Sequence, residues 1–223
     1  DEPVLEISSS MDIGDSPAGQ LGRVYAFSNA QQVKLYKNDV FVTDLARSEW
    51  DSLPHPPFVV DDTIGELLET QEHFAPAKAA LLRDCLLAAG KYGLPGLPLS
   101  YKLKLGWCML RYKMTFADGV ALYGKYVGNW GGAATRWRFD AVQDGKVVRS
   151  VTLCPGTKLH LEVRTSRTTL WEADTYDMAA VRVRVLDENG NPATYAQLPV
   201  RFAVEGDAAL AGPETAAAEG GMT

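Results

Sequence analysis

Residues 181–191 decide the fold class, and they read Val181-Arg182-Val183-Arg184-Val185-Leu186-Asp187-Glu188-Asn189-Gly190-Asn191. Valines alternate with arginines at a period of two, which is typical of a strand with one apolar and one polar face. The Asp-Glu-Asn-Gly-Asn run has the composition of a turn, and Val200, Phe202 and Val204 predict the next strand. We therefore expect an immunoglobulin-like β-sandwich over 166–223, apparently truncated because only about half of such a module fits.

The same strand pattern occurs earlier in the chain. The predicted strands are 24–28, 33–36, 40–42, 137–142, 146–151 and 159–163. Asp144-Gly145 predicts a hairpin turn, and Leu159, Leu161 and Val163 alternate with polar residues as in a half-buried strand. We expect one β-sandwich domain over 1–165. By contrast, residues 206–223 are rich in alanine and glycine and show no packing pattern.

A helical insertion is expected at about 58–128, where apolar residues recur at helical spacing. Capping boxes occur at Thr63-x-x-Glu66 and Thr115-x-x-Asp118. The expected helix starts are Thr63, Pro76, Ser100 and Thr115. The third helix would bury a face formed by Leu103, Trp107, Leu110 and Met114. The fold class is therefore mainly β, a sandwich interrupted by an α-helical subdomain and followed by a partial second sandwich.

Charge is unevenly distributed around these helices. Residues 49–77 hold seven acidic and no basic side chains, whereas residues 85–117 hold five basic and no acidic ones. The simpler interpretation is that two complementary faces pack together, and the alternative is a docking surface for another domain.

The composition limits the partners. The 223 residues carry a net charge of −6, so we expect neither nucleic acid nor a membrane surface as a partner. No apolar run reaches the ~18–20 residues that span a bilayer. The three cysteines, Cys85, Cys108 and Cys154, are odd in number, and we expect structural thiols in a cytoplasmic protein, with secretion left open. Because the chain opens Asp1-Glu2-Pro3, we expect a fragment of a longer polypeptide.

Several stretches resemble the C-terminal sandwich domains of glycoside hydrolase family 2, with β-galactosidase-like members among them. The stretches are Tyr25–Ala30 followed by Val33–Asn38, Glu172–Ala179, Val181–Gly190, Val204–Gly206 and Tyr123–Gly132. Thr175 stands where the family usually has glycine. The resemblance implies a parent enzyme that hydrolyses β-galactosides with two glutamates in a TIM barrel. Since no eightfold strand–helix alternation occurs here, we carry over no catalytic residue.

Other catalytic and metal-binding patterns are weak. Asp62 and Glu66 lie where a helix start favours negative charge, and no His-x-x-x-His or Cys-x-x-Cys spacing occurs. Asp187-x-Asn189-x-Asn191 imitates a calcium loop, but Pro192 and Leu198 replace the required glycine and glutamate. We therefore expect no catalytic residue, no metal and no cofactor in this chain.

The tryptophans are the main candidates for contacts. Trp50, Trp130 and Trp137, with Asn129 beside Trp130, are candidate carbohydrate or domain-interface residues because they lie in or beside predicted loops. An exposed indole can stack on the C–H face of a sugar, whereas burial of Trp130 at the joint between helices and sandwich is the simpler expectation. Trp107 and Trp171 are expected in the core.

Together these patterns favour a non-catalytic accessory region that braces the catalytic barrel and subunit contacts of a glycoside hydrolase. The expected partners are the catalytic domain of the same polypeptide, a second copy in a homo-oligomer, and a carbohydrate. The alternative is a carbohydrate-binding or adhesin-like module that uses its exposed tryptophans.

Overall fold

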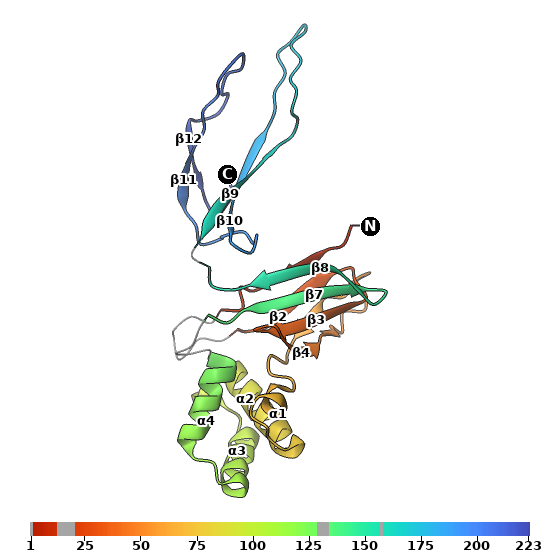
Figure 1. The fold of residues 1–223 in the computed structure, drawn as a ribbon, viewed down its shortest axis with the longest axis vertical. Coiled ribbons are helices and arrows are strands. Elements are labelled where there is room, and N and C mark those ends of the chain that lie inside the picture. The colour runs from red at the N-terminus through yellow and green to blue at the C-terminus, as the bar shows by residue number, and fades with distance from the viewer. Residues whose placement is uncertain (1, 13–20, 129–133, 157) are drawn as a thin grey trace. The chain divides into compact units, whose positions relative to one another are not determined.

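The computed structural model describes residues 2–12, 21–128, 134–156 and 158–223, which form a mainly β chain with antiparallel sheets and a run of helices (Figure 1). The chain divides into two compact units, Asp1–Pro155 and Gly156–Thr223. In the described part of the chain, no helix has the length and apolar character needed to cross a bilayer.

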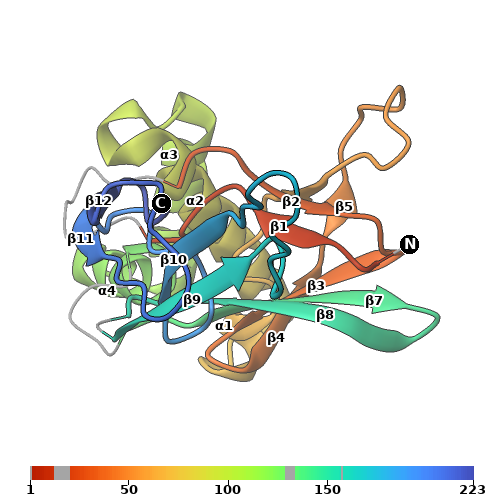
Figure 2. The ribbon, with the colours of Figure 1, turned by 90° about the horizontal axis from the view of Figure 1, so that it is seen from above.

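The first unit contains two four-stranded antiparallel sheets. In spatial order, one consists of β1 (Leu5–Ile7), β2 (Val24–Ser28), β6 (Phe58–Val60) and β5 (Ala46–Arg47). The other consists of β4 (Val40–Asp44), β3 (Gln32–Lys37), β7 (Trp137–Gln143) and β8 (Lys146–Leu153). β7 and β8 form the long hairpin predicted from Asp144-Gly145, and its turn lies at the right of Figure 2.

Both sheets contribute to one apolar core. Alternate residues along β2 and β3 are buried, among them Val24, Ala26, Val33 and Leu35, and Phe139 of β7 joins them. This alternation is what a strand with one covered face requires. The apolar periodicity that predicted these strands is therefore confirmed.

All the helices lie between β6 and β7. They are α1 (Leu67–Thr70), α2 (Pro76–Gly96), α3 (Leu99–Tyr112), α4 (Phe116–Tyr123) and the π-helix η1 (Gly124–Gly128). The core of the sheets continues into them through Leu67, Leu82 and Tyr126. Helix α2 is kinked at Gly93, where φ is 69°, as expected of a residue without a Cβ.

Two of the four predicted helix starts are confirmed. Pro76 occupies the first turn of α2, and Thr115 forms a capping box with Asp118 at the start of α4. The predicted box at Thr63 is wrong, because Asp62 Oδ1 accepts hydrogen bonds from the backbone N–H groups of Ile64 and Gly65 instead. The predicted cap at Ser100 is also wrong, since α3 already begins at Leu99, after Pro98, without a side-chain cap.

The second unit contains two pairs of antiparallel strands. β9 (Leu159–Thr165) pairs with β10 (Val181–Asp187), and β11 (Leu198–Arg201) pairs with β12 (Thr215–Ala218). Val183 and Val185 of β10 are buried together with small residues and Val200. The strand predicted from Val181, Val183 and Val185 is therefore confirmed.

Three details of this unit differ from the expectations. β9, assigned to the first sandwich, pairs with β10, so the break between units falls between Pro155 and Gly156 rather than at residue 165. Leu161 and Val163 are exposed rather than half-buried. Residues 206–223 contain the strand β12, although no packing pattern was expected there. Ala218 of this strand is fully buried, because its side chain is small enough to pack closely.

Candidate functional site

A groove of about 690 Å³ lies in the first unit and is lined by residues of β2, β5, β6 and α2 and by the loop after β5. Its size is in the range of ligand-binding clefts, about 300–1,000 Å³. The residues that matter below are Tyr25, Arg47, Ser48, Trp50, Asp61 and Tyr92.

Strand register sets the sheet side of this groove. Val59 of β6 lies opposite Tyr25 of β2 on one side and opposite Ala46 of β5 on the other. The three residues therefore form one row across the sheet. Tyr25 and Phe27 are two residues apart and point to the same face, away from buried Val24 and Ala26.

Trp50 adds a third ring beside the aromatic side chains of Tyr25 and Phe27, and we call these three rings the aromatic row. Its indole lies 5.1 Å from the ring of Tyr25, centroid to centroid, with the planes tilted by 35°. The ring of Tyr25 lies 6.4 Å from that of Phe27, with a tilt of 45°. The side chain of Trp50 is 47% exposed, so the stacked position leaves much of the indole open to solvent.

Polar groups stand beside these rings. The guanidinium of Arg47 donates to the carbonyl oxygens of Pro56 at 2.9 Å and Ala30 at 2.6 Å and lies over the ring of Phe58. The Oγ atom of Ser48 is buried and finds no hydrogen-bond partner among the described residues. Arg47 is thus held in place by the backbone, whereas the Ser48 hydroxyl is an unused hydrogen-bonding group in the groove lining.

The predicted contact residues do not come together at this groove. Trp50 lines it, but Trp137 is only 2% exposed and lies in the core at the start of β7. The interpretation of Trp137 as a loop residue available to a partner is thereby corrected, because the first residue of β7 points inward. Trp130 and Asn129 lie outside the residues that the structure describes.

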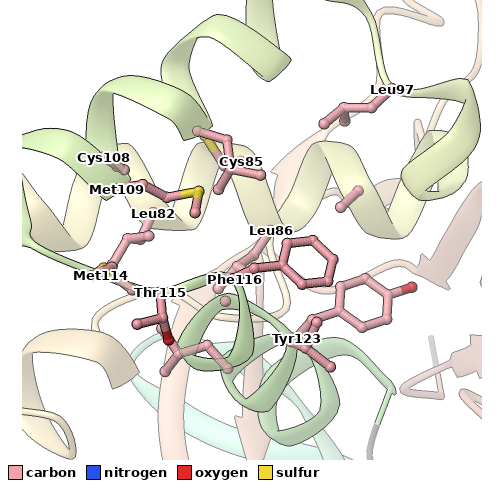
Figure 3. A pocket seen from close by; sticks show the side chains of 15 residues that line it. Leu82, Cys85, Leu86, Leu97, Cys108, Met109, Met114, Thr115, Phe116 and Tyr123 are labelled. Atoms are coloured by element: carbon pink, nitrogen blue, oxygen red, sulfur yellow. The ribbon is translucent and has the colours of Figure 1, made fainter.

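Trp107 and Trp171 are exposed, so their expected place in the core is wrong. Helix α3 has two apolar sides. It packs Leu105, Cys108 and Met109 toward α2 and α4, and these residues line an apolar cavity of about 70 Å³ (Figure 3). The opposite side consists of exposed apolar residues, namely Leu99, Leu103, Trp107 and Leu110, which we call the α3 face.

The cavity itself is chemically inert. Cys85 and Cys108 are buried at its wall. Burial raises the pKa of the Cys85 thiol to about 11 and also raises the pKa of Cys108. Because the nucleophile is the thiolate, both side chains act as small apolar groups at neutral pH.

A buried lysine joins the sheet to the helices. Nζ of Lys37 donates to the carbonyl oxygens of Lys125 and Tyr126 in η1 and lies 5.1 Å from the ring centroid of Trp137. Burial, with a smaller contribution from the charge of Lys125, lowers the pKa of Lys37 to about 8. Beside it, the carboxylate of Glu72 accepts from Lys125 Nζ and from the Tyr126 hydroxyl. The hydrogen bonds from Lys37 Nζ to η1 therefore connect the sheet to the helices.

The groove was only partly predictable. Trp50 is among the contact residues predicted from the sequence, but Tyr25 and Tyr92 of the groove are not. The alternation of Tyr25 and Phe27 in a strand could have signalled one outward-facing aromatic row. Among the described residues, no cluster of three or more His, Cys, Asp or Glu side chains could hold a metal ion.

Comparison with known proteins finds two similarities. Residues 161–220 match glycoside hydrolase family 2 C-terminal domain 5. Over these residues the chain is similar to the C-terminal region of that family. It is also 25% identical over 201 residues to a β-galactosidase of Thermoanaerobacter pseudethanolicus. This alignment covers 89% of the chain but 19% of that relative, so the chain spans about a fifth of the relative's length.

Proposed function

We propose that this chain is a non-catalytic accessory region of a β-galactosidase-like glycoside hydrolase, where it braces the catalytic barrel and the contacts between subunits. The match of residues 161–220 to the family 2 C-terminal domain carries the proposal. In its finer form, the proposal includes an immunoglobulin-like sandwich interrupted by a helical insertion, and a second such sandwich. Two sheets sharing one core in the first unit, and the helices between β6 and β7, support this architecture.

The α3 face is the surface that suits a bracing role. Four apolar side chains follow one side of the helix, and Trp107 is 57% exposed. Lys102, Arg111 and Lys113 stand on the same helix or at its end. An apolar patch bordered by positive charge fits a partner surface that combines apolar residues with carboxylates.

The partner that covers the α3 face is, in this proposal, the catalytic part of the same polypeptide. The β-galactosidase relative is about five times as long as the segment that aligns with this chain, and thus offers ample further surface. A second copy of the chain is the competing occupant, since its residues 49–77 hold seven acidic and no basic side chains. The following experiment distinguishes the two.

The test introduces Leu103→Asp and Trp107→Asp together into the parent enzyme, with Val147→Asp on the exposed side of β8 as a matched control. We expect the double variant to be inactivated by heat sooner, with its subunit composition in sedimentation velocity unchanged. Dissociation of subunits would instead assign the face to a second copy. Unaltered heat inactivation and assembly in the double variant would refute the bracing role of α3.

The alternative function, a carbohydrate-binding or adhesin-like module, is favoured by one observation, the exposed indole of Trp50 in a groove. Trp137 gives it no support because this side chain is buried. Bracing and sugar binding use different surfaces of the first unit.

A further inference from the structure

We propose that the groove around Trp50 binds a neutral oligosaccharide, which contacts the open part of the Trp50 indole where that indole packs on Tyr25. This inference stands on the geometry of the groove and does not rest on the bracing role. It concerns residues of the first unit alone.

The indole of Trp50 is held at the groove by a neighbouring ring. It lies 5.1 Å from the ring of Tyr25, centroid to centroid, with the planes tilted by 35°. At this distance one ring partly covers the other. Tyr25 therefore supports the indole, and the open part of the indole is the surface that a sugar ring can reach.

The chemistry of the row also favours sugars. The C–H face of a pyranose is apolar and carries a slight positive charge, which complements the negative face of an aromatic ring. Trp50 is 47% exposed although it contacts Tyr25. Tyr92 of α2 is exposed at the groove as well, so aromatic side chains line it on both its sheet side and its helix side.

Hydroxyl groups of a sugar need donors and acceptors close to the rings, and the groove provides both. Asp61 and Glu49 offer carboxylate oxygens, and Arg23 offers a guanidinium.

Charge balance sets the class of sugar. Among the residues that line the groove, the three basic ones are Arg23, Arg47 and Lys91, and the three acidic ones are Glu49, Asp61 and Asp84. Equal numbers of opposite charges give no net attraction for an anionic glycan. The groove therefore favours a neutral oligosaccharide over one rich in uronic acid or sulfate.

The test is a calorimetric titration of the 223-residue chain with β-1,4-galactotetraose, cellotetraose and a tetramer of galacturonic acid. We expect saturable binding of a neutral tetrasaccharide that Trp50→Ala weakens about tenfold or more, because stacking and burial of the apolar sugar face are lost together. Trp50→Phe, which keeps a ring, should retain part of the affinity. Trp171→Ala removes an exposed indole of the second unit, outside the groove, and should leave binding unchanged.

Several results would overturn the proposal. One is the absence of binding to both neutral tetrasaccharides. Another is equal affinity of Trp50→Ala and the unaltered chain for a neutral tetrasaccharide. The third is binding of the galacturonic acid tetramer that is as tight as binding of the neutral sugars. Should Trp50→Ala fold poorly in circular dichroism, Tyr92→Ala carries the same test from the helix side of the groove. Because Trp107 serves the α3 face and Trp50 the groove, failure of either proposal leaves the other measurable.

Discussion

The side chain of Lys37 donates a hydrogen bond from Nζ to the backbone carbonyl oxygen of Tyr126 across 3.0 Å. Lys37 ends β3, and Tyr126 lies in the π-helix η1. The bond therefore ties one sheet of the first unit to the last turn of its helices. π-Helical turns alter the normal backbone ladder of a helix, and here a lysine supplies donors to two of the carbonyls in that turn.

The lowered pKa of Lys37 predicts a rise of stability with pH. Below about pH 8 the folded and unfolded chains both hold the proton, whereas between about 8 and the ordinary value of 10.5 only the unfolded chain holds it. Raising the pH in this window therefore favours the folded state, by up to about 1.4 kcal/mol per pH unit. Urea unfolding from pH 7 to 10 should show this rise in the unaltered chain and lose it in Lys37→Met. Lys34→Met, three residues away on the opposite face of β3, should preserve it.

Gly65 predicts a severe backbone clash on substitution. Its φ is +51°, and a Cβ at this position would overlap the backbone carbonyl of Val42. Gly65→Ala should lower the free energy of unfolding by about 3 kcal/mol or more, since strain and overlap add. Gly106→Ala is the matched control. It lies in α3 with open space around it and should stabilise by about 0.5–1 kcal/mol. Equal unfolding free energies for the two variants in urea would contradict this account.

The start of α4 depends on Thr115. Its hydroxyl accepts from the backbone N–H of Asp118, and the Asp118 carboxylate accepts from the backbone N–H of Thr115 at 2.7 Å. Thr115→Ala should cost about 1 kcal/mol. Ser100→Ala tests the other expected cap and should change little, because α3 has no side-chain cap. Thermal melts would disprove the assignment if Ser100→Ala proved the more damaging change.

Asp187 organises the turn of the second unit. Its Oδ1 accepts from the backbone N–H groups of Asn189 at 2.8 Å and Asn191 at 2.9 Å. Asp187→Ala leaves these two donors without their acceptor and should destabilise the second unit by about 1–3 kcal/mol. Limited proteolysis should cleave Asp187→Ala near this turn sooner than Glu188→Ala, whose exposed carboxylate makes none of these bonds. Identical cleavage rates would show that the turn is held by its backbone bonds alone.

The sequence predicted the strands better than the faces of the helices. In β10 valines alternate with arginines from Val181 to Val185, and the structure buries Val183 and Val185 on the valine side. In α3 the apolar residues lie on two sides, and the stripe through Leu103 and Trp107 was chosen although the structure buries the side with Cys108. Periodicity reveals an apolar stripe but does not say which of two stripes is covered.

The candidate groove was harder to predict because its walls come from separate parts of the chain. Trp50 could be singled out from its loop position, yet the same reasoning applied to Trp137 was wrong, since this residue begins β7. Tyr25 and Tyr92 meet the groove only after β2 and α2 have folded around it. Contacts of this kind follow from the tertiary fold, and the local pattern of each element does not show that the two elements meet.

The helices also matter as a mechanical element. β6 belongs to one sheet of the first unit and β7 to the other, so the helical run bridges the two halves of the core. A pull on α3 would reach the strands through the close approach of Gly65 to Val42 at one end and the Lys37–Tyr126 bond at the other. Weakening either attachment would let α3 move more easily relative to the sheets, even with every side chain of that helix unchanged.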